Sequence, residues 1–201
     1  MLLTGSSESD TLVSTAGNDV LDGGGGTDTA HYSGAASNFV ITKTTIGYQV
    51  VDQRGTKSTD TLTGVERLKF DDVYVALDVE GSAGMAYRLY QAAFNRKPDA
   101  GGLGYQLTAL DRGLDVAQVA AHFMASPEFQ SVYGASSDAQ LVTQFYRNVL
   151  HRDPDAGGLA FHLGNLASSH ARANVLAGFS ESPENQAALI GVMQNGMVYT
   201  L

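Results

Sequence analysis

Three aspartates near the start of the 201-residue chain, Asp10, Asp19 and Asp28, are spaced nine residues apart. A carboxylate supplies a hard, charged oxygen, which suits Ca²⁺. The turns before these aspartates are rich in glycine, and glycine tolerates the positive φ angles that let main-chain carbonyls converge. The candidate metal-binding residues are therefore Asp10, Gly17, Asn18, Asp19, Gly24, Gly26 and Asp28.

The aspartates belong to three nine-residue copies, Thr4–Leu12, Val13–Leu21 and Asp22–Ala30. Each copy ends with an apolar residue two positions after its aspartate. The last copy, DGGGGTDTA, fits best, and the first is degenerate. The pattern G-G-x-G-x-D-x-U-x is typical of calcium-binding parallel β-helix repeats. Simple Asx turns between strands are the alternative, which three copies in phase disfavour.

This stretch resembles the RTX (repeats-in-toxin) calcium-binding family. The resemblance implies that two nonapeptides form one coil, so that turns on the same edge lie 18 residues apart. It also implies that Asp10 and Asp28 share one ion. Asp19 would then stack on Ser37, which has no carboxylate, and the second site would be at best half built.

Residues 38–78 are expected to form a β cap that closes the roll. Two β-rich runs, Asn38–Lys43 and Gly47–Val51, flank a plausible hairpin turn, and a further strand is expected at Val73–Leu77. Asp60 and Leu62 repeat the aspartate-to-apolar offset of the nonapeptides. Asp60 is a candidate for a further calcium ligand, but we favour its interpretation as an ordinary turn residue. The segment resembles the C-terminal flank of the β-roll in secreted RTX proteins.

From Gly84 onward the chain changes from Gly, Thr, Ser and Asp to Ala, Leu, Gln and Arg at helical spacing. We expect two domains, with residues 1–80 forming a calcium-binding β-roll with its β cap and residues 81–201 a helical module. The predicted fold class is α+β, with a short parallel β-roll followed by an all-α domain. That domain is expected to contain two four-helix repeats, at about 85–134 and 138–195.

The helical module contains an internal duplication. A shift of 56 residues aligns Met85–Gln130 with Leu141–Gln186 without a gap, and both copies contain R-x-P-D-A-G-G-L and S-P-E. Asp99 and Asp155 follow a proline and precede a helical pattern, so we interpret them as helix N-caps rather than metal ligands. The region resembles a helical domain of unknown function found in bacterial RTX and surface-layer proteins.

Aromatic residues of the module, among them Tyr105, Tyr133 and Phe161, are candidates for stacking on sugars. Most of them are expected in the core, because they fall on apolar helical stripes. No catalytic motif is found. The chain has no cysteine and no H-E-x-x-H, and Gly178–Ser182 lacks the last glycine of G-x-S-x-G. We therefore expect a protein that is not an enzyme.

The net charge of −9, from 12 basic and 21 acidic residues, argues against nucleic acid and anionic membranes as partners. No window of 18 apolar residues predicts a membrane span. The N-terminus lacks the basic and apolar regions of a signal peptide. Together with the RTX resemblance, this implies export by the type I secretion apparatus and a location outside the cell or at the bacterial cell surface.

These observations favour a secreted, calcium-binding, non-catalytic protein with Ca²⁺ as its cofactor. The helical module is expected to mediate adhesion, through a polysaccharide such as exopolysaccharide, a surface-layer protein or another copy of itself. The alternative is that the chain is the C-terminal calcium-binding and secretion module of a larger secreted protease or glycan-active enzyme.

Overall fold

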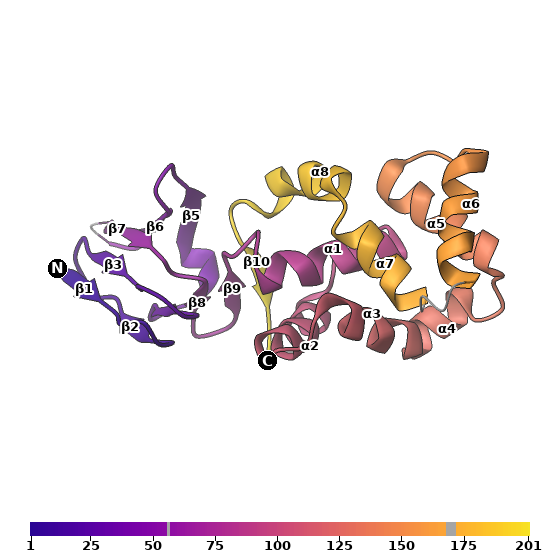
Figure 1. The fold of residues 1–201 in the computed structure, drawn as a ribbon. Coiled ribbons are helices and arrows are strands. Elements are labelled where there is room, and N and C mark those ends of the chain that lie inside the picture. The colour runs from indigo at the N-terminus through magenta and orange to yellow at the C-terminus, as the bar shows by residue number, and fades with distance from the viewer. Residues whose placement is uncertain (56, 168–171) are drawn as a thin grey trace. The chain divides into compact units, whose positions relative to one another are not determined.

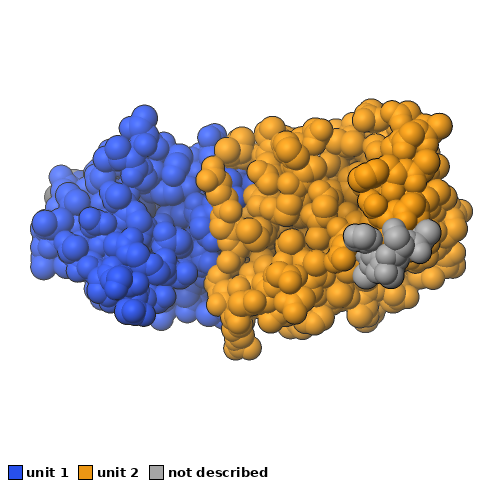
Figure 2. All heavy atoms as spheres, in the orientation of Figure 1, with its two compact units in different colours: residues 1–79, 192–201 blue, residues 80–191 orange. Residues whose placement is uncertain are grey.

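The computed structural model describes all residues except 56 and 168–171 (Figure 1). The chain combines two β-sheets with eight described α-helices, so the fold is mixed α+β. It divides into two compact units (Figure 2). The first contains residues 1–79 and 192–201, and the second contains residues 80–191.

Short strands of the first unit alternate between the two sheets. One sheet contains β1 (Leu2–Thr4), β3 (Val20–Asp22) and β7 (Thr59–Thr63) in parallel. The other contains β2 (Thr11–Val13), β4 (Thr29–His31) and β8 (Arg67–Lys69), also in parallel. Leu2 pairs with Val20 and Thr11 with Thr29. The predicted spacing of 18 residues between stacked turns is therefore confirmed for the first two coils.

Apolar side chains fill the space between the two sheets. Each of them lies two residues after an acidic residue, and all are buried: Leu12, Leu21, Ala30, Leu62 and Leu68. Because alternate residues of a strand point to opposite faces, the short strands place one apolar residue inside and its neighbours outside. Burial of this apolar ladder holds the coils together.

A hairpin separates the second coil from the third. It consists of β5 (Phe39–Lys43) and β6 (Tyr48–Asp52), preceded by the short 3₁₀ helix η1 (Ala36–Asn38). The predicted hairpin is confirmed. The expected stacking of Asp19 on Ser37 is wrong, because β7 rather than the segment after β4 pairs with β3.

The last strands of the first unit are antiparallel. β9 (Tyr74–Ala76) pairs with β8, and β10 (Met197–Tyr199) pairs with β9. Residues 192–201 thus lie in the first unit and not in the helical module, where they were expected. Burial of Met197 and Tyr199 in this sheet explains the difference.

The second unit is helical. Its first four helices are α1 (Ser82–Phe94), α2 (Ala100–Asp111), α3 (Val116–Ala125) and α4 (Pro127–Tyr133). The next four, which begin in the second unit, are α5 (Asp138–Leu150), α6 (Ala156–Ala167), α7 (Arg172–Ser180) and α8 (Pro183–Met193). Within 1–55, 57–167 and 172–201, no helix combines the length and apolar character needed to cross a membrane.

Both copies of the duplicated motif contain the predicted helix caps. Oδ1 of Asp99 accepts a hydrogen bond from the Gly102 amide at 2.8 Å, and Oδ1 of Asp155 accepts one from the Gly158 amide at 2.7 Å. The helix before each motif ends earlier than its proline, at a residue in the left-handed region, Asn95 or His151. A tyrosine hydroxyl lies against each capped glycine and leaves no room for a Cβ.

Two duplicated aromatics are not in the core. Tyr105 and Phe161 are 66% and 65% exposed, so the expectation of burial is wrong for both. Tyr105 lies on the opposite side of α2 from the buried Leu103 and Leu107. Tyr133, in contrast, is half-buried, and its hydroxyl donates a hydrogen bond to the Ala93 carbonyl at 2.8 Å.

Candidate calcium site

On one edge of the roll, three acidic residues form a column, one in each coil. The amide of Asp10 donates a hydrogen bond to Oδ1 of Asp28 at 2.8 Å. The amide of Asp28 in turn donates to Oε2 of Glu66 at 2.8 Å. The carboxylates of Asp28 and Glu66 are thereby each fixed by the preceding coil, and the column Asp10–Asp28–Glu66 continues from the first turn to the third.

The opposite edge repeats this arrangement with Asp19 and Asp60. The amide of Asp19 donates to Oδ1 of Asp60 at 2.9 Å, and the hydroxyl of Ser14 donates to Oδ2 of Asp60 at 2.7 Å. The carboxylate of Asp60 therefore takes the stacked position that was expected for Ser37. Asp60 is part of the repeat rather than an ordinary turn residue, because the hairpin shifts the third coil along the sequence.

Main-chain atoms of successive turns pack closely on the first edge. Gly24 and Gly26 have φ angles of +92° and +101°. A Cβ added to Gly24 would lie 2.1 Å from the Ser6 carbonyl oxygen, and one added to Gly23 would lie 2.0 Å from that of Gly64. Only glycine allows this approach, which brings carbonyl oxygens next to the column of acids.

Burial makes the charge of Asp28 costly. Its side chain is fully buried, and in the part of the chain that the structure describes Oδ2 has no hydrogen-bond partner. A buried carboxylate oxygen without a partner is strongly unfavourable unless a cation compensates it. Asp28 is therefore the residue at which the structure most needs a positive ion.

The neighbouring acids differ in their proton affinity. Hydrogen bonds from the amide and hydroxyl of Ser6 hold the pKa of Asp10 below its usual value. Burial tends to raise the pKa of Asp19, but hydrogen bonds from Thr15 and the Met1 amino group outweigh it and lower this pKa. Burial and the charge of Asp28 raise the pKa of Glu66.

Two of the candidate metal-binding residues, Gly17 and Asn18, do not lie in the crowded turn beside Asp28. Gly17 is exposed, is outside the left-handed region and would meet no atom within 4 Å if it carried a Cβ. Oδ1 of Asn18 accepts a hydrogen bond from the Thr59 amide at 2.8 Å, which ties its turn to the third coil. Both lie with Asp19 on the second edge and are not brought together with Asp28.

Across the described residues, no three His, Asp or Glu side chains gather in a cluster that would hold a metal by themselves. An ion at this edge would need main-chain carbonyls as well as Asp10 and Asp28. The nonapeptide pattern did not identify Glu66 as a member of the column. The sequence does contain a signal for it, however. Glu66 precedes the buried Leu68 by two residues, as each aspartate of the repeats precedes its apolar residue.

The stacked turns and the apolar ladder define a β-roll of nonapeptide repeats. Residues 4–34 match the family model of the RTX calcium-binding nonapeptide repeat, which comprises four copies. Residues 120–189 match the model of a domain of unknown function, DUF4214. The chain thus carries RTX repeats, which bind calcium and are typical of secreted proteins, and a DUF4214 domain. Neither family is catalytic. No curated protein matches the chain.

Proposed function

We propose that the protein is secreted and non-catalytic, and that its β-roll binds Ca²⁺ outside the cell. The ligands on the first edge are Asp10 and Asp28, with the turn of Gly24 and Gly26 supplying main-chain oxygens. The observation that carries this proposal is the fully buried Asp28, whose Oδ2 has no hydrogen-bond partner among the described residues. Calcium is the natural cation here because it accepts several carboxylate and carbonyl oxygens in flexible geometry.

The second edge is proposed as a further calcium site. Asp19 provides its carboxylate, and Gly17 and Asn18 form its turn. The stacked Asp60 supports this site, because it supplies the second carboxylate that the sequence had not placed there. Glu66 extends the first edge in the same way. We accordingly propose two calcium-binding edges.

Equilibrium dialysis of the full chain, after treatment with chelator, tests calcium binding. We expect saturable binding with a dissociation constant of about 0.1–1 mM, which is typical of extracellular modules. Magnesium is the control and should bind far more weakly, because it requires near-ideal octahedral geometry. Absence of saturable calcium binding would contradict the proposal.

The helical module is proposed to attach the protein to exopolysaccharide. Tyr105 and Phe161 support a sugar-binding role, because they occupy equivalent positions in the duplication and both are exposed. An exposed aromatic ring offers an apolar face on which a sugar ring can stack. A surface-layer protein and a second copy of the chain are the two alternative partners of the module. Export by the type I secretion apparatus is part of this proposal.

Replacing both exposed rings should reduce binding to polysaccharide and leave stability unchanged. We expect the double variant Tyr105→Ala/Phe161→Ala to lose about fivefold or more in affinity, since two aromatic contacts contribute about 0.5–1.5 kcal/mol each. Binding is measured by sedimentation with insoluble bacterial exopolysaccharide. Val132→Ala is the matched control, because Val132 is also exposed on a helix but is aliphatic.

Two outcomes separate the possible partners. Polysaccharide binding that is unaffected by the double variant would contradict the role of these rings. A loss of self-association in analytical ultracentrifugation, without any polysaccharide binding by the unaltered chain, would instead assign the rings to contact between copies.

A further inference from the structure

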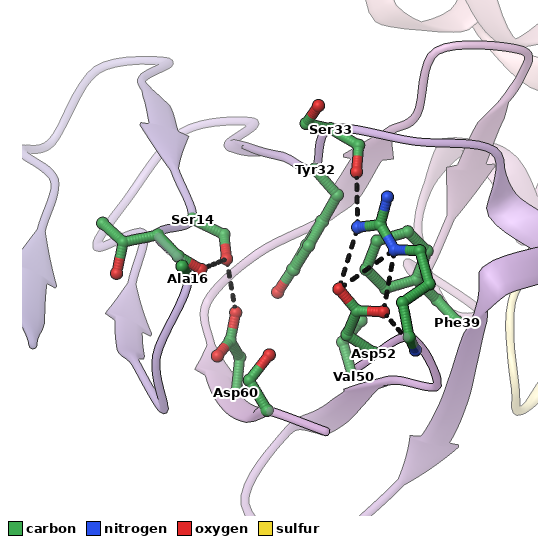
Figure 3. Close-up of a pocket in the computed structure, with 11 residues that line it drawn as sticks. Ser14, Ala16, Tyr32, Ser33, Phe39, Val50, Asp52 and Asp60 are labelled. Carbon is green, nitrogen blue, oxygen red and sulfur yellow. Dashed lines mark hydrogen bonds and ion pairs between the residues drawn. The ribbon is translucent and has the colours of Figure 1, made fainter. Parts of the chain in front are cut away.

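The first unit contains a cavity of about 240 Å³ beside the hairpin, and Asp60 of the second edge is among the residues that line it (Figure 3). The turn after β2 lines it on one side, through Ser14, and the hairpin strands line it on the other, through Phe39 and Asp52. At roughly 30 Å³ for each water molecule in the liquid, this volume corresponds to about eight waters. The cavity therefore has room for one small organic ring.

Tyr32 lies at the centre of the cavity wall, with its ring held by other aromatic rings. The ring centroid of Phe39 is 5.3 Å away in an edge-to-face arrangement, and that of Phe70 is 5.6 Å away in a stacked one. Tyr32 is only 4% exposed, and its hydroxyl lies near the carboxylate of Asp60 without forming a hydrogen bond of good geometry among the described residues. A buried hydroxyl without a well-formed hydrogen bond costs free energy that a bound ligand would recover.

The charged groups of the cavity are already fixed by the protein. Nε and Nη2 of Arg54 donate to both carboxylate oxygens of Asp52 at 2.8–3.2 Å, and Nη2 also donates to the Ser33 carbonyl at 2.7 Å. The Arg54 guanidinium carbon lies 5.0 Å from the centroid of the Phe39 ring. Because this ion pair is neutral as a whole, the cavity offers no net positive charge to an anion.

Asp60 is the second acidic group of the cavity, and it favours a ligand that donates hydrogen bonds. Its Oδ2 already accepts from the Ser14 hydroxyl at 2.7 Å. The phenol of Tyr32 is able both to donate and to accept a hydrogen bond. The cavity combines aromatic rings, a neutral ion pair, hydroxyls and one carboxylate.

We propose that this cavity binds a single neutral sugar ring, with the Tyr32 hydroxyl as a hydrogen-bond partner of a sugar hydroxyl. A sugar ring has one apolar face for the aromatic wall and several hydroxyls for Asp60, Asp52 and Ser14. A phosphate or carboxylate ligand fits less well, because Asp60 repels it and Asp52 already neutralises Arg54. The site lies outside the helical module and adjoins the proposed second calcium edge, with which it shares Asp60.

The experiment is binding of neutral monosaccharides to the calcium-saturated full chain, measured by ligand-observed nuclear magnetic resonance. D-glucose, D-galactose and D-mannose are the probes, each tested together with its linear trisaccharide. If the cavity holds only one sugar ring, the further rings of a trisaccharide add no contact. We therefore expect one monosaccharide and its trisaccharide to bind with similar affinity. Much tighter binding of the trisaccharide would overturn the single-ring proposal.

The Tyr32→Phe variant removes one oxygen and keeps the ring packing. We expect it to weaken sugar binding by about tenfold, with a melting temperature equal to or above that of the unaltered chain. Tyr48→Phe is the control, because the Tyr48 hydroxyl donates to the Leu77 carbonyl at 2.8 Å, and Tyr48 does not line the cavity. This control should leave sugar affinity unchanged.

A second variant tests the cavity without altering a buried residue. Ala16 is exposed and lines the cavity, so Ala16→Phe should obstruct it and abolish sugar binding while the circular dichroism spectrum stays the same. The proposal is overturned if no neutral sugar binds to the folded, calcium-loaded chain. It is equally overturned if Tyr32→Phe and Ala16→Phe both bind sugar as tightly as the unaltered chain.

Discussion

Removing calcium should destabilise the first unit strongly and leave the helices of the second unit in place. This unit contains three aspartates that are almost fully buried, Asp19, Asp28 and Asp60. Without a cation their mutual repulsion opposes closure of the coils, so that calcium-binding free energy becomes folding free energy. At about 10 mM calcium and a dissociation constant of about 0.1–1 mM, each ion contributes about 1.4–2.7 kcal/mol.

Thermal melting followed by circular dichroism measures this effect, in chelator and then in calcium. We expect two transitions in chelator, with the β-sheet signal lost first, and an upward shift of that transition in calcium. Magnesium at the same concentration controls for ionic strength. An unchanged β-sheet signal and an unchanged melting temperature would show that the roll folds without calcium.

Asp28→Ala should reduce calcium binding more than Asp19→Ala. Asp28 lies between two acidic neighbours of its column, Asp10 and Glu66, whereas Asp19 is stacked on one other carboxylate, Asp60. Loss of the Asp28 charge thus affects two successive turns, and we expect calcium affinity to fall by about tenfold or more, since charge count sets the affinity of such sites. Calorimetric titration of the two variants makes the comparison.

The variant Asp28→Asn separates binding from folding. Its amide oxygen can still accept the hydrogen bond from the Asp10 backbone, but the buried charge is gone. In chelator we expect this variant to be more stable than the unaltered chain, and in calcium less stable, because the charge that opposes the apo fold is the one that attracts the ion.

A greater loss of calcium binding in Asp19→Ala than in Asp28→Ala would contradict the first of these two predictions. It would show that the second edge, and not the first, binds calcium more tightly.

The first two coils were predictable because their signal is local and periodic. Nine residues separate one turn from the next, and each apolar residue, such as Leu12 or Leu21, marks the interior. The caps at Asp99 and Asp155 were predictable for the same reason, since a cap depends on the residues within one helical turn.

The third coil was not predictable from the period. The hairpin of β5 and β6 interrupts the repeat, and no local rule says how long such an excursion lasts before the chain returns to the sheet. Asp60 and Glu66 therefore take their places in the two columns only through the pairing of β7 with β3 and β8 with β4. The three-residue strand β10 depends on a similarly distant pairing with β9.

The exposure of Tyr105 and Phe161 shows a different limit. Both residues lie within helices rich in leucine, and we expected most such rings in the core because we assigned them to the apolar stripe of the helix. The deciding factor is their angular position on the helix, which places Tyr105 away from the stripe formed by Leu103 and Leu107. Residues that break the apolar stripe in both copies of a duplication are the better guide to a binding surface.

The hairpin also sets an order in which the first unit can assemble. β5, β6 and β7 are neighbours in sequence and pair antiparallel, so each closes only a short loop. Pairing of β3 with β7 is parallel and joins residues far apart in the chain, which makes it slower. We therefore expect the antiparallel strands to form first and to serve as a template for the coils that contain the calcium turns. Assembly of the roll is then expected to proceed from the hairpin toward the start of the chain, opposite to the direction in which the chain is synthesised.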